Sequence, residues 1–78
     1  MRVALIQLLN TDDKDYNLAH AAEMIVEAAK DGTDMVVLPE MFCCEYRNRS
    51  FIKHQEPYGG PACQMLARTA REHGIWLI

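Results

Sequence analysis

The sequence predicts an α/β fold in which parallel strands alternate with helices, and three patterns support this prediction. Short apolar runs recur at residues 2–8, 35–38 and 75–78. Between them, residues 18–29 and 63–70 repeat apolar side chains about every 3.6 positions, as one face of a helix does. The resulting order of strand, helix, strand, loop plus helix, strand is typical of parallel sheets with right-handed crossovers.

The first strand and helix each have a recognisable pattern. Residues 2–8 are apolar on both faces for most of their length, which predicts a buried strand covered on both sides. Acidic residues at 12–15 then place negative charge where a helix N-terminus has unpaired N–H groups. Gly32 follows the periodic stretch, at the position of a left-handed C-terminal residue. We therefore expect the first helix to end there.

The second half of the chain is less regular. The strand at residues 35–38 ends at Pro39, because proline cannot donate a ladder hydrogen bond. Residues 41–58 show no sustained period and predict a long structured loop, or a loop with a short helical turn. Pro61 suits the first position of a second helix, which Gly74 closes. A third strand begins after that glycine.

Composition excludes several classes of function. With 8 Lys+Arg, 11 Asp+Glu and a net charge of −3, the chain has no basic cluster to bind nucleic acid. Its apolar runs are far shorter than the ~20 residues of a membrane-spanning helix, and it lacks the pattern of a secretory signal. Three cysteines without C-x-x-C spacing indicate reduced thiols and no zinc site. We expect a cytoplasmic protein without a metal or cofactor.

The size of the chain sets a further expectation. Two helices can shield one face of a sheet, but they cannot also shield the other. A chain that stops inside an apolar strand leaves an unpaired edge, which proteins normally avoid. We therefore expect residues 1–78 to be the N-terminal portion of a single larger domain, apparently truncated, and unstable or self-associating when isolated.

Glu40 is the most informative residue for chemistry. Ligands of open α/β sheets bind outside the carboxyl ends of the strands, and Glu40 directly follows one of them. Apolar neighbours on both sides predict a partly desolvated carboxyl, which suits a proton-transferring group. The alternative is an ordinary solvated glutamate at a strand end.

The cysteines and histidines allow a second chemical reading. A thiol enzyme could use Cys43 or Cys44 with His54, but cysteine is often buried, and we expect both thiols to be buried or to line a pocket. Cys63 lies on the apolar stripe of the second helix and is expected in the core. The histidines lack H-x-x-x-H or H-E-x-x-H spacing, so no metal site is predicted.

Residues 34–42, Asp-Met-Val-Val-Leu-Pro-Glu-Met-Phe, form the most specific motif of the chain. With the start Met-Arg-Val-Ala-Leu-Ile-Gln and the helix ending Ala-Ala-Lys-Asp-Gly, this motif resembles the N-terminal region of the nitrilase superfamily, in its amidase-like branch. Gly60-Pro61, Leu66-Ala67 and residues 72–75 also match. The resemblance spans nearly the whole chain.

The resemblance implies a carbon-nitrogen hydrolase with an α-β-β-α sandwich and a Glu-Lys-Cys triad. Glu40 matches the glutamate of the triad, the general base, whereas the family's lysine and cysteine lie downstream of this region. Lys53 does not align with that lysine, and we expect it to be solvated. Tyr46 matches a position where amidases often carry an aromatic residue near the substrate.

The same resemblance implies a small-molecule amide or carbamoyl substrate, no cofactor, and a homo-oligomer. The 78 residues alone are then expected to be inactive. A rival hypothesis from another class is a non-catalytic α/β interaction module. Such a module would keep only the family's N-terminal layer and pair its open edge with another chain.

Overall fold

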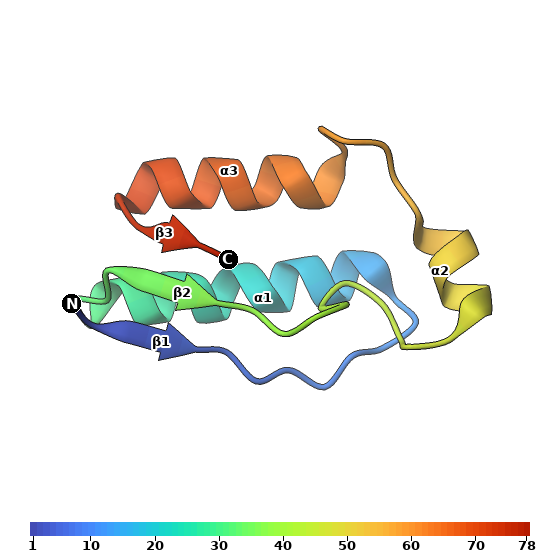
Figure 1. Cartoon of the computed structure of the whole chain (residues 1–78), viewed down its shortest axis with the longest axis horizontal. Helices are drawn as coiled ribbons and strands as arrows, with labels where there is room; N and C mark the ends of the chain where they lie inside the picture. The colour runs from blue at the N-terminus through green and yellow to red at the C-terminus, as the bar shows by residue number, and fades with distance from the viewer.

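Three parallel strands form the sheet of the structure, a computed structural model that describes residues 1–78. The central strand β2 (Met35–Val37) pairs with β1 (Val3–Leu5) on one side and with β3 (Trp76–Leu77) on the other. The first crossover contains α1 (Lys14–Lys30), and the second contains α2 (Asn48–His54) and α3 (Pro61–His73) (Figure 1). The predicted mixed α/β fold and element order are confirmed.

The two long helices begin and end where local signals placed them. The Asp13 side chain caps α1 by accepting a hydrogen bond from the Tyr16 N–H at 3.0 Å. Gly32 follows α1 with a φ of 78°, and Gly74 closes α3 with a φ of 62°, both in the left-handed region that favours glycine. None of the helices combines the length and apolar character needed to cross a membrane.

The short helix α2 lies within the aperiodic segment, which confirms the alternative of a loop with a helical turn. Its first residues receive no side-chain cap, since Arg47 precedes them without a capping hydrogen bond. Helices this short are marginal in isolation. Contacts with the rest of the chain must therefore hold α2 in place.

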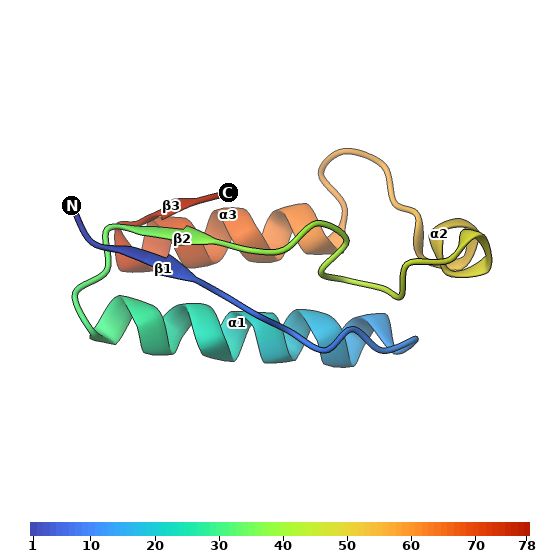
Figure 2. The ribbon, with the colours of Figure 1, turned by 60° about the horizontal axis from the view of Figure 1, so that its bottom comes forward.

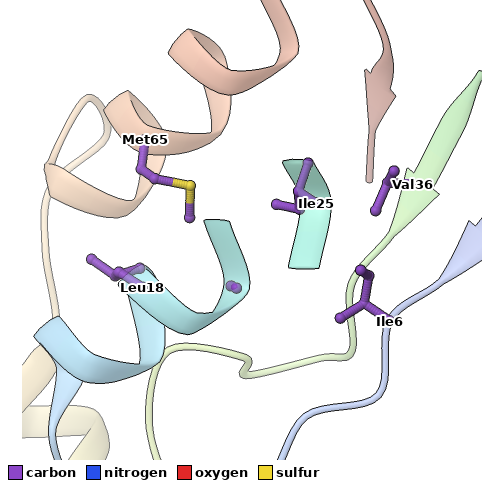
Figure 3. Packing of buried hydrophobic residues seen from close by; sticks show 6 residues of the cluster. Ile6, Leu18, Ile25, Val36 and Met65 are labelled. Atoms are coloured by element: carbon purple, nitrogen blue, oxygen red, sulfur yellow. The ribbon is translucent and has the colours of Figure 1, made fainter. Parts of the chain in front are cut away.

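The core lies between the sheet and the pair α1 and α3. Figure 2 shows these helices on the same side of the strands, as two right-handed crossovers in the order β1-β2-β3 require. Strand register aligns Ala4, Val36 and Leu77 in one row that faces the helices. Six buried side chains form the centre of the core (Figure 3), namely Ile6, Leu18, Ala21, Ile25, Val36 and Met65.

The opposite face of the sheet is exposed, so the expectation of a first strand buried on both sides was wrong for this structure. Val3 is 47% exposed, Leu5 80% and Trp76 70%. The reason is topological, because both crossovers place their helices on the other face. The strands are also shorter than predicted: beyond Leu5, only the Ile6 N–H still reaches β2, donating to the Val37 carbonyl at 2.9 Å.

Candidate functional site

Glu40 lies at the edge of the sheet where all three parallel strands have their carboxyl ends. Strand β2 ends at Val37, and the next residue, Leu38, still donates its N–H to the Ile78 carbonyl at 2.8 Å. The chain then enters a turn at residues 40–43. Glu40 thus begins this turn, two residues beyond the last backbone bond of the sheet, at the edge where ligands of α/β sheets bind.

The Glu40 side chain is exposed, and none of the ion pairs in the structure involves it. The expected enclosure by apolar neighbours was therefore wrong. Leu38 and Phe42 instead turn toward the core and pack against it, which leaves the carboxylate between them in solvent. An exposed carboxylate at this edge is accessible to a group that approaches from outside.

Tyr46 lies farther along the same segment, just before α2. Its side chain is 76% exposed, and its ring meets Phe51 of α2 edge-on at a centroid distance of 5.3 Å. The structure thus brings Tyr46 to α2 and shows no contact that joins it to Glu40. Both side chains are accessible on the segment that connects β2 with α2.

Two asparagines, one in the loop between β1 and α1 and one in α1, donate hydrogen bonds to the backbone of the Glu40 turn. The Asn10 Nδ2 donates to the Met41 carbonyl at 2.7 Å, and the Asn17 Nδ2 donates to the Cys43 carbonyl at 2.9 Å. Sequence reasoning missed both residues. A signal existed for Asn17, because it precedes Ala21 and Ile25 at intervals of four on the buried stripe of α1, where a polar side chain needs a partner.

The cysteines fit the expectation of buried thiols more closely than that of a nucleophile. Cys44 is 2% exposed, and burial, with a smaller effect of the Cys43 thiol, raises its pKa. Cys43 is half-buried and packs against the core. His54 does not serve either thiol, because its Nε2 lies 2.9 Å from the Asp12 backbone carbonyl and 3.2 Å from the Asp12 Oδ1.

Cys63 departs from its predicted place in the core. It is half-buried, stands outside the buried cluster, and lines an apolar groove between α3 and β3 together with Leu66 and Trp76. The apolar stripe of α3 therefore extends beyond the part of the helix that is buried. Met65 and Thr69 form the part of α3 that is buried.

Asp12 forms hydrogen bonds with three side chains of α2. Its carboxylate accepts hydrogen bonds from the Lys53 Nζ at 2.9 Å and the Ser50 Oγ at 3.1 Å. These two bonds lower the pKa of Asp12 from 3.8 to about 2, with a further contribution from His54. The bond from Lys53 has the largest effect. Lys53 was expected to be solvated, and its side chain is 57% exposed as expected, although it also pairs with Asp12.

A second polar contact joins α1 to the start of α3. The Lys14 Nζ donates to the His54 carbonyl at 2.7 Å and pairs with the Glu56 carboxylate. Glu56 also accepts from the Ala62 N–H at 3.0 Å. Burial alone would raise the pKa of Glu56, but the bonds from Lys14 and from the backbone of Cys63 and Ala62 outweigh burial and lower it.

No group of three His, Cys, Asp or Glu side chains gathers at one point as the ligands of a metal ion would. The chemistry that the structure offers at the sheet edge is that of a single accessible carboxylate on a turn fixed by side-chain amides. Comparison with known proteins identifies the family of the chain as a whole. The profile of the family named Carbon-nitrogen hydrolase matches residues 2–78.

This chain belongs to the carbon-nitrogen hydrolase family. The resemblance to the nitrilase superfamily is therefore confirmed, and the three-stranded α/β fold agrees with the N-terminal part of that family's architecture.

Several relatives of this hydrolase-family chain are omega-amidases. Omega-amidase NIT2 of Mus musculus is 40% identical over 77 residues, which are 99% of this chain and 28% of the relative. Omega-amidase NIT2-B of Xenopus laevis is 38% identical over 77 residues, which are also 99% of this chain and 28% of the relative. Hydrolase C26A3.11 of Schizosaccharomyces pombe is 38% identical over 78 residues, 97% of this chain and 24% of the relative. The chain thus spans about a quarter of the length of these relatives.

Proposed function

We propose that residues 1–78 are the N-terminal portion of the single domain of an amidase-type carbon-nitrogen hydrolase, to which they contribute the general base Glu40. The observation that carries the proposal is the position of Glu40 at the carboxyl edge of the sheet, inside a family match that covers residues 2–78. The omega-amidase relatives support an amide as the bond that is cleaved.

The reaction is acyl transfer through a thioester. A cysteine thiolate attacks the amide carbon, the C–N bond breaks and the nitrogen leaves as ammonia or amine, and water then releases the acid from the thioester. Glu40 takes the proton from the thiol and delivers it to the leaving nitrogen. In the second half it takes a proton from water and returns it to the cysteine sulfur. A lysine stabilises the oxyanion.

The lysine and the cysteine come from parts of the domain outside residues 1–78. None of the three cysteines present fits the role of nucleophile: Cys44 is buried with a raised pKa, Cys43 packs against the core, and Cys63 lies on α3. The 78 residues by themselves are therefore inactive. Their contribution is a carboxylate on a turn whose backbone is already held in place.

The substrate is a small-molecule amide or carbamoyl compound, and Tyr46 lines its pocket. An exposed aromatic ring braced by Phe51 offers a flat apolar surface with a hydroxyl at its tip, which suits a small polar ligand. No cofactor takes part, and neither nucleic acid nor a membrane is a partner. We place the enzyme in the cytoplasm as a homo-oligomer.

A chimera tests the reaction class. Residues 1–78 replace the matching 77-residue region of the mouse omega-amidase NIT2, whose remaining chain supplies the rest of the domain. Ammonia release is measured with small primary amides that carry a carboxylate, with carbamoyl compounds and with nitriles. We expect turnover of an amide or carbamoyl compound by the chimera and none by the 78-residue chain. A folded chimera that hydrolyses none of these compounds would contradict the proposal.

The exposed outer face of the sheet favours a second candidate, the non-catalytic interaction module. Val3 and Trp76 belong to a row that the structure leaves uncovered, and such apolar patches mark contact surfaces. This candidate predicts that the natural protein lacks amidase activity and binds another chain through this row. Activity of the chimera that is lost on changing Glu40 would count against this candidate, because a non-catalytic module has no need of a working general base.

A further inference from the structure

We propose that Asn10 is a positioning residue for Glu40: its side-chain amide holds the peptide that follows Glu40 in the conformation that presents the carboxylate. This inference rests on the proposed function of Glu40 as the general base. It concerns a residue in the loop between β1 and α1, 30 positions away in the sequence.

The first observation is the backbone of Met41. Its φ of 56° makes it the one residue other than glycine with a φ in the left-handed region. A residue with a long side chain rarely adopts this conformation, and it persists where the surrounding structure holds it. Met41 directly follows Glu40, so the φ of Met41 sets the direction in which the backbone continues after the glutamate.

The second observation is the contact that holds this peptide. The Asn10 Nδ2 lies 2.7 Å from the Met41 carbonyl oxygen, whereas the other donor to that oxygen, the Cys44 N–H, is at 3.5 Å. The side-chain bond is the shorter and stronger of the two. Asn10 therefore supplies the main interaction that orients the Met41 carbonyl.

The third observation separates Asn10 from Asn17. Asn17 uses its whole amide: its Oδ1 accepts from the Thr11 Oγ1 at 2.8 Å, and its Nδ2 donates to the carbonyls of Thr11 and Cys43. Asn10 donates to Met41, while its Oδ1 is buried without a hydrogen-bond partner. Turning the amide over would exchange the positions of Nδ2 and Oδ1. Oδ1 would then face the Met41 carbonyl oxygen, and two acceptors cannot bond to each other.

A buried acceptor without a partner lowers the stability of the folded state. An apolar side chain of similar shape would remove this cost together with the benefit of the bond to Met41. Asn10 therefore adds little to stability on balance, and its contribution is the orientation of the Glu40 turn. Asn17 also bonds to the turn, at the Cys43 carbonyl, but both ends of its amide are satisfied, so its replacement should cost stability as well.

The test uses the chimera that carries residues 1–78 and compares Asn10→Leu with Asn17→Leu. Asn10→Leu should lower kcat by about 10- to 100-fold, the scale of a small misplacement of a catalytic group, while KM and the thermal midpoint stay unchanged. Asn17→Leu should lower the thermal midpoint. Adding Met41→Gly to Asn10→Leu should restore part of kcat, because glycine adopts the left-handed conformation without the Asn10 bond.

Wild-type kcat for Asn10→Leu would overturn the inference, and so would a kcat that falls only in step with the thermal midpoint and does not recover with Met41→Gly. If Asn10→Leu does not fold, Asn10→Asp loses the same donor with the shape retained, and wild-type kcat for that variant overturns the inference equally. Glu40→Gln is measured in parallel. Full turnover of Glu40→Gln would refute the proposed role of Glu40 itself. If Glu40→Gln loses turnover while Asn10→Leu keeps wild-type turnover, only the positioning role of Asn10 is refuted.

Discussion

At the scale of single residues, the Asp12 carboxylate joins three side chains of α2 to the start of α1. Lys53, Ser50 and His54 all bond to it. Because these bonds favour the ionised form, the pKa of Asp12 falls from 3.8 to about 2 on folding. The folded state therefore holds one proton less than the unfolded state between these two pH values.

The pH dependence of stability follows from this shift. A lowered carboxyl pKa adds stability that is fully present above about pH 4 and is lost as the pH falls through about 2. In the chimera, Asp12→Asn should reduce the free energy of unfolding at pH 7, and its difference from wild type should shrink as the pH falls toward about 2 and vanish below that value. Urea unfolding at several pH values measures this difference. Glu23→Gln, on the exposed side of α1, is the control, and an equal effect of both variants would refute the role of Asp12.

The reactivity of Cys44 provides a second test at this scale. Burial to 2% exposure and a raised pKa keep its thiol protonated and out of reach. Iodoacetamide near neutral pH should therefore label Cys44 much more slowly in the folded chimera than in denaturant, as peptide mass spectrometry can follow. Rapid labelling of Cys44 in the native protein would reopen the thiol-enzyme reading.

At the scale of elements, the N-terminus of α3 depends on a side chain outside the helix. Gly60 precedes the helix and offers no side-chain cap, so Glu56 accepts the hydrogen bond of the Ala62 N–H in its place. A Cβ on Gly60 would lie 2.9 Å from the Glu56 side chain, which shows how closely the two approach. Lys14 balances the charge of Glu56 from α1.

Removing this cap should weaken the attachment of α3. Glu56→Ala in the chimera should lower the free energy of unfolding by about 0.5 to 2 kcal/mol, the usual effect of losing an N-terminal cap. Glu72→Ala, an exposed residue at the other end of α3, should have a much smaller effect. Chemical denaturation compares the two variants, and equal stabilities would show that Glu56 does not act as a cap.

The elements also show which features could be predicted from the sequence. The ends of α1 and α3 were predictable, because Asp13, Gly32, Pro61 and Gly74 act through bonds and dihedral angles within a few residues. The extent of α2 was not, because its contacts with Asp12 join residues about 40 positions apart. The same limit applies to the site. The edge position of Glu40 follows from its strand, but its exposure and the bond from Asn10 to Met41 depend on distant residues.

At the scale of the whole molecule, one face of the sheet is covered and the other is exposed. The uncovered side chains include Leu5, Trp76 and Ile78, each at least 70% exposed. Burying one such side chain contributes about 1.5 to 3 kcal/mol, a large share of the about 5 to 15 kcal/mol that stabilises a typical domain. A further layer or another chain on this face would therefore change the stability of residues 1–78 considerably.

The isolated 78-residue chain should self-associate through this face. Sedimentation velocity should detect species larger than the monomer, and Leu5→Glu should reduce their fraction because it places charge on the exposed face of the sheet. Leu9→Glu is the matched control, since Leu9 is equally exposed but lies outside the strands. A monodisperse monomer that unfolds cooperatively well above room temperature would show that 78 residues form a complete domain.

The central claim is that residues 1–78 supply the general base of an amidase, and the kcat of Glu40→Gln in the chimera tests it most directly. The substitution keeps the size of the side chain and removes its ability to take a proton. We predict a loss of about 10²- to 10⁴-fold in kcat, the scale of a positioned proton-transfer group, with an unchanged thermal midpoint, whereas Glu45→Gln in the same segment retains activity. Wild-type turnover by the folded Glu40→Gln chimera would contradict the claim.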